Sequence, residues 1–232
     1  MRRSTVHNQH SRTVLPALFS ATLVLFCTTA SAVNQGDWLV RAGVGYVHPN
    51  DSSGAVTGIA GSGVSVDSAT NVELTIAYML TPNVNVELLG ALPFKHDIKG
   101  KGSIAGLGKI AETKQLPPTL VIDYMFNPQS NIRPYVGAGI NYTSFFKSKS
   151  TAALDAALGP TSIDLDDSWG AAAQAGIDVD LNKDWFFNAS IWYMDIHTKA
   201  TLNSTNLSVT TTRTVDVDIN PWALAVGIGT HF

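Results

Sequence analysis

The segment WALAVGIGTHF, residues 222–232, alternates two kinds of side chain along its whole length. Every second residue is large and apolar or nearly so: Trp222, Leu224, Val226, Ile228, Thr230 and Phe232. Alanine, glycine or histidine occupies the positions between them. A period of two predicts a β-strand, and bulky apolar residues on one face with small residues on the other are typical of the wall of a narrow membrane barrel.

Seven further segments show the same alternation and are predicted to be strands. With the segment above, the predicted strands are residues 38–48, 71–80, 84–94, 115–126, 133–146, 168–180, 185–199 and 213–232. Short turns (81–83, 127–132 and 181–184) alternate strictly with long connections (49–70, 95–114, 147–167 and 200–212). The pattern predicts an all-β fold: an eight-stranded antiparallel up-and-down transmembrane β-barrel with short periplasmic turns and long extracellular loops.

The first 32 residues are typical of a signal peptide. Arginines precede an apolar run at 14–26, and Ala30-Ser31-Ala32 forms a cleavage site, which leaves residues 33–232 as the outer-membrane barrel. Removal of three arginines leaves 12 basic and 18 acidic residues, a net charge of −6 with histidine neutral, and no cysteine. This composition argues against a nucleic-acid partner and against disulfide stabilisation.

Aromatic residues near the strand ends are expected to anchor the barrel at both lipid interfaces. The predicted periplasmic girdle is Trp38, Tyr124, Phe126, Trp185 and Phe232. The predicted outer girdle is Tyr46, Phe94, Tyr142, Trp169 and Tyr193.

Inward positions predict two layers in the lumen. Polar residues expected low in the barrel, as a plug, are Arg41, Glu87, Asp123 and Asp178. Apolar residues expected above them, as a pocket, are Val47, Leu89, Val121, Trp192 and Met194. Buried charges persist only when they are paired, so Arg41 would pair with the carboxylates. The alternative is that these side chains simply fill a narrow barrel.

Prolines fall at similar heights on two neighbouring predicted strands, at Pro93 and at Pro117-Pro118. Because proline cannot donate to a ladder, we expect incomplete pairing there and a lateral seam through which an apolar molecule could reach the bilayer. The alternative is that the prolines only end the strands above the membrane.

Other motifs favour ordinary structural roles. The glycine pairs lack the third glycine and the helix of a dinucleotide site, so no cofactor is expected. His48, His96 and His197 have no metal-ligand spacing, although all three could lie near the outer rim, which leaves a weak metal site there as an alternative. No nucleophile motif predicts an enzyme. A lysine-rich stretch in 95–114 is either a solvated loop or a contact for lipopolysaccharide phosphates. Residues 150–158 are predicted to form a short helix at the pore mouth.

Several segments resemble the OmpW family of outer-membrane proteins. They are LPPTLVIDYMF (116–126), RPYVGAGINYTSFF (133–146), the stretch from Ser168 to Ile196 and DINPWALAVGIGTHF (218–232). The resemblance implies an eight-stranded barrel in a Gram-negative outer membrane that passes or binds small hydrophobic molecules, because alkane importers of the AlkL type are among the relatives. It also implies that the barrel-assembly machinery recognises Phe232.

Three functions are therefore considered. The favoured one is a passive channel or binding barrel for small hydrophobic molecules. The alternatives are a non-transporting structural or recognition barrel whose loops bind a partner, phage or bacteriocin, and a soluble lipocalin-like carrier.

Overall fold

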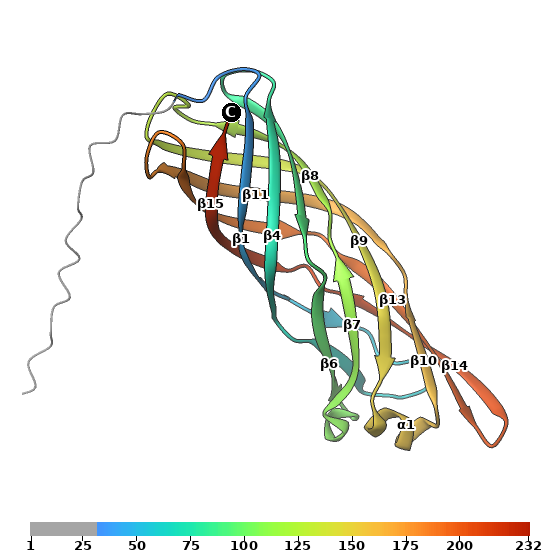
Figure 1. Ribbon diagram of the computed structural model, residues 1–232. Coiled ribbons are helices and arrows are strands. Elements are labelled where there is room, and N and C mark those ends of the chain that lie inside the picture. The colour runs from blue at the N-terminus through green and yellow to red at the C-terminus, as the bar shows by residue number, and fades with distance from the viewer. Residues whose placement is uncertain (1–31) are drawn as a thin grey trace, which may run out of the picture.

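The computed structural model describes residues 32–232 (Figure 1). The expected signal peptide therefore lies, up to residue 31, outside the described residues. No helix within residues 32–232 has the length and apolar character needed to cross a membrane.

Eight strands form a closed antiparallel barrel. In wall order they are β1 (Trp38–His48), β4 (Ala69–Met79), β5 (Val84–Ala91), β8 (Thr119–Met125), β9 (Ile132–Ser150), β11 (Ser168–Asp180), β12 (Phe186–Met194) and β15 (Trp222–His231). The pairing of β15 with β1, which sets Val44 opposite Val226, closes the cylinder. The eight-stranded architecture predicted from the alternation is confirmed.

The barrel wall is apolar outside and filled inside. Large apolar side chains of β15, such as Leu224 and Val226, are more than half exposed. On the inner face Gly43 and Gly227 oppose each other, and a side chain on either would meet the neighbouring backbone. Glycine therefore makes room for the close approach of β1 and β15.

Most of the expected long loops are strands that extend the barrel at one end, called the outer extension (Figure 1). One side of the extension continues from β9 through β7 (Lys109–Leu116) and β6 (Phe94–Gly102) to β3 (Ser62–Val66). The other is a sheet of β10 (Thr161–Leu165), β13 (His197–Asn206), β14 (Val209–Asp218) and β2 (Ser52–Ser53). A 3₁₀ turn, η1 (Ala105–Leu107), and a helix, α1 (Ala152–Leu158), complete it.

The prolines interrupt two predicted strands. The strand expected at 84–94 ends at Ala91 and resumes as β6, and the one expected at 115–126 is divided into β7 and β8. The break at Pro93 shifts the alternation by one residue, so that Leu92 faces outward and Phe94 inward. Phe94, predicted to lie in the outer girdle, is instead only 3% exposed.

Candidate functional site

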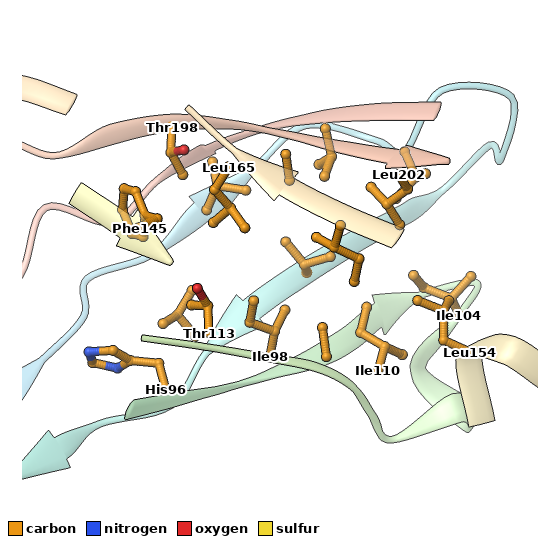
Figure 2. Close-up of a pocket in the computed structure, with 18 of the residues that line it drawn as sticks. His96, Ile98, Ile104, Ile110, Thr113, Phe145, Leu154, Leu165, Thr198 and Leu202 are labelled. Carbon is orange, nitrogen blue, oxygen red and sulfur yellow. The ribbon is translucent and has the colours of Figure 1, made fainter. Parts of the chain in front are cut away.

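The outer extension encloses an apolar cavity of about 140 Å³. Its wall includes Ile98, Ile110, Phe145, Leu154, Leu165 and Leu202, which point toward a common interior (Figure 2). Apolar cavities of about 150 Å³ in other proteins stay dry and accept benzene-sized molecules. The cavity therefore suits a small apolar molecule and disfavours a polar one.

His96 is the one buried imidazole on the wall of this cavity. Its Nδ1 donates a hydrogen bond to the carbonyl oxygen of Asp67 at 2.7 Å. Burial lowers the pKa of His96, which keeps the ring neutral. Nε2 has no hydrogen-bond partner among the described residues, and in this tautomer it is an acceptor.

A smaller cavity of about 20 Å³ lies on the barrel side of the large one. Val47, Leu89, Trp192 and Met194, all predicted pocket residues, line it, and Gln115 lines both cavities. The fifth predicted pocket residue, Val121, is 1% exposed and belongs to the same apolar cluster without lining this cavity. The two cavities are separate but share Gln115 on their walls, and apolar residues of both belong to one buried cluster that extends into the barrel.

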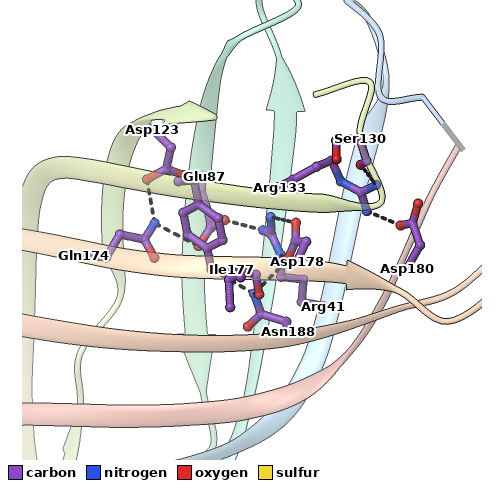
Figure 3. Close-up of polar contacts among 11 residues, drawn as sticks. Arg41, Glu87, Asp123, Ser130, Arg133, Gln174, Ile177, Asp178, Asp180 and Asn188 are labelled. Carbon is purple, nitrogen blue, oxygen red and sulfur yellow. Dashed lines mark hydrogen bonds and ion pairs between the residues drawn. The ribbon is translucent and has the colours of Figure 1, made fainter. Parts of the chain in front are cut away.

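Below this region the structure brings Arg41 together with the predicted carboxylates (Figure 3). The guanidinium donates to Asp178 Oδ2 at 2.8 Å and to Oδ1 at 3.1 Å, and it also bonds the Glu87 carboxylate. Asp123 joins through Gln174, whose Nε2 donates to Asp123 Oδ1 at 2.7 Å and to Glu87 Oε1 at 3.2 Å. We call this network the polar plug.

Sequence reasoning missed a second layer beneath the plug. Arg133 is ion-paired with Asp180, and both side chains are at most 1% exposed. The Phe186 ring lies between the layers, with its centroid 5.6 Å from Arg41 Cζ and 5.4 Å from Arg133 Cζ. The inward alternation of 132–150 and 186–194 would have identified Arg133 and Phe186. Together the layers close the lower lumen.

The wall has an unpaired gap at the prolines. Pairing of β5 with β8 stops at Leu89–Thr119, and pairing of β6 with β7 begins at Phe94–Gln115. A side chain of the neighbouring strand bonds residues 116–118 instead: Asn141 Nδ2 donates to the carbonyl of Pro117 at 3.3 Å. We call this break, bounded by residues 90–93 and 116–118, the proline gap. Ala91, Phe94 and Pro117 line the small cavity, so that cavity reaches the edge of the gap.

The expected anchors of the periplasmic interface all project from the wall. The side chains of the predicted periplasmic girdle are 44–73% exposed: Trp38, Tyr124, Phe126, Trp185 and Phe232. Ring pairs occur at both ends, Trp38 with Tyr78 at 4.9 Å and Tyr142 with Trp169 at 4.7 Å between centroids. Exposed aromatic rings at two levels mark the interfaces of a membrane barrel.

The histidines considered for a rim metal site are not gathered together. His96 is buried, whereas His197 lies between Asp195 and Asp218 on the surface. Within residues 32–232 no group of three or more His, Cys, Asp or Glu side chains is arranged to hold a metal ion.

A closed cylinder with an apolar outer surface, aromatic girdles and a plugged lumen defines the class of integral outer-membrane β-barrels. Within that class, the chain belongs to the OmpW family, which it matches over residues 34–232. Outer membrane protein W of Vibrio cholerae is 44% identical over 221 residues, which cover 94% of this chain and 96% of the relative.

A solved structure and a more distant relative extend the comparison. The crystal structure of the outer membrane protein OprG from Pseudomonas aeruginosa is similar, with a TM-score of 0.80 and 38% identity over 88% of this chain and 99% of that one. Outer membrane protein AlkL of Ectopseudomonas oleovorans is 27% identical, covering 85% of this chain and 83% of the relative. The protein is therefore located in the outer membrane of a Gram-negative cell, and the outer extension projects outside.

Proposed function

We propose that the protein binds small hydrophobic molecules from outside the cell and conducts them passively into the outer membrane, with lateral exit through the proline gap. The observation that carries the proposal is the apolar cavity in the outer extension, beside which a second, small cavity reaches the edge of that gap.

The closed lower lumen supports lateral exit rather than passage straight through. An apolar molecule moving down the barrel would meet Arg41 and its carboxylates, all buried and mutually paired. Displacing such groups from one another is unfavourable because each would be left as an uncompensated buried charge. The bilayer beside the gap is an apolar destination that requires no such disruption.

The proline gap supports the same route. Neither Pro93 nor the Pro117-Pro118 pair can donate a backbone hydrogen bond, so a ladder cannot form across these positions. Moving the wall apart there breaks no strand pairing between residues 90–93 and 116–118, whereas anywhere along the paired strands it would break several hydrogen bonds.

Uptake of radiolabelled naphthalene by cells with and without the protein tests the function. We expect severalfold faster uptake with the protein and no change for labelled glycerol. Replacing Pro93→Val, Pro117→Thr and Pro118→Val should bring naphthalene uptake close to that of cells without the protein, because a paired wall would no longer part.

The matched control replaces prolines in the periplasmic turns, Pro82→Ala and Pro128→Ala, and should leave uptake unchanged. Unchanged uptake in the gap variant would refute lateral exit. Equal naphthalene uptake with and without the protein would refute transport and favour a recognition barrel.

A further inference from the structure

A basic groove lies on the outward face of the outer extension, separate from the apolar cavity. It has a volume of about 180 Å³ and is lined by Lys95 of β6, Lys114 of β7 and Lys147 and Lys149 of β9, together with Glu112 and Thr113. The three strands are neighbours in one sheet.

A β-bulge brings two of these lysines onto the outward face. The pairing of β7 with β9 shifts between Glu112 and Lys114, and Lys147 has a φ of +54°, in the left-handed region that a lysine rarely adopts. Before the bulge Phe145 faces the cavity, and after it Ser148 faces inward and bonds the Thr113 hydroxyl at 2.9 Å. Without the extra residue, Lys147 and Lys149 would share the inward face of Phe145.

The groove has more positive charge than its own acid can balance. Glu112 is bonded to Lys95 at 2.7 Å and to Lys109 at 3.1 Å, and these two lysines lower its pKa to about 2. Lys114, Lys147 and Lys149 form no ion pair with any residue in 32–232. Three ammonium groups in one groove are therefore left for an external anion.

The groove lies on the head-group side of the membrane interface. The aromatic pair of Tyr142 and Trp169 marks that interface on β9 and β11. Lys147 and Lys149 follow Tyr142 on β9 by five and seven residues, about 17 and 24 Å along the strand, and Lys114 lies opposite Phe146. The lysines are therefore outside the acyl chains, on the side where phosphorylated head groups and their sugars extend.

We propose that this groove binds a phosphate group of lipopolysaccharide in the outer leaflet. Ammonium groups hold phosphate oxygens by charge-assisted hydrogen bonds, and three lysines without carboxylate partners more than offset the charge of a phosphomonoester, about −1.5 to −2 at pH 7. The site would fix the outer extension against the surrounding lipid, and it does not depend on the proposed transport function.

Binding of lipid A to the purified barrel in phosphatidylcholine nanodiscs tests the site. The groove variant is Lys114→Gln, Lys147→Gln and Lys149→Gln. Each basic residue near a charged membrane surface contributes roughly fivefold to affinity, so the variant should bind diphosphoryl lipid A at least tenfold more weakly. Thermal unfolding of the variant should match that of the parent, because the three side chains make no ion pairs.

The control variant removes the same charge from lysines that pair with acids on this chain: Lys99→Gln, Lys101→Gln and Lys199→Gln. It should bind within about twofold of the parent. Equal binding by the groove and control variants would overturn the proposal, as would equal binding of dephosphorylated lipid A by the parent. If inorganic phosphate at the same concentration as lipid A displaces it from the groove, free phosphate rather than lipopolysaccharide would be the ligand, and the proposal would be overturned.

Discussion

Replacing Arg41 by alanine should destabilise the barrel more than any other single change in the lumen. The side chain is 4% exposed, and it is ion-paired with Glu87 and Asp178, which are 1% and 0% exposed. Removal of one partner from a buried ion pair costs about 3–5 kcal/mol, because the remaining charge is left unpaired. Two carboxylates lose their partner here, so we expect the upper part of that range.

Urea unfolding of the protein in phospholipid vesicles, followed by tryptophan fluorescence, measures this effect. The comparison variant is Arg41→Met with Glu87→Gln and Asp178→Asn, which removes the whole charge network. Since a buried network can be replaced by neutral groups with little loss, the comparison variant should be much more stable than Arg41→Ala. A loss below about 1 kcal/mol for Arg41→Ala, or equal instability of both variants, would refute the reasoning.

Two further predictions concern single positions. Gly139→Ala would set a methyl group against a backbone carbonyl of the neighbouring strand and should cost about 1–3 kcal/mol of unfolding free energy, whereas Gly106→Ala, with open space around it, should cost less than about 0.5 kcal/mol. The hydrogen bond to Asp218 raises the pKa of His197 above 6.5, so this pair should stabilise the β13–β14 hairpin by a few tenths of a kcal/mol below about pH 6.5. The hairpin should lose that contribution as pH rises through the raised pKa. An NMR titration of the His197 ring and of the hairpin amide protection measures the effect, and an unshifted pKa would contradict the prediction.

The barrel could be predicted because its wall residues face lipid. Outward positions must be large and apolar in every membrane strand, so the period of two is unbroken in segments such as 38–48, and that strand has the predicted bounds. The polar plug could also be predicted from the sequence, because Arg41 and its carboxylates lie on the inward face of strands whose register follows from the alternation.

The outer extension could not be predicted in the same way. Its strands face water on one side, so their outward residues are polar, and in β13 the inward ones include Thr198 and Ser204. Such segments have the composition of loops. The position of Phe94 was wrong because the alternation gives no sign that Pro93 shifts it by one residue. The second charged layer was missed because Arg133 and Asp180 lie at strand ends, where boundaries are least certain.

The most direct test of the central claim is photo-labelling with a small apolar diazirine, followed by mass-spectrometric mapping of the modified residues. If apolar molecules occupy the outer cavity above a closed lumen, the label should be found on Ile98 and Phe145 and be absent from Met79 and Met125, which are buried below the plug. Labelling of Met79 and Met125 with no label in the outer cavity would contradict the account.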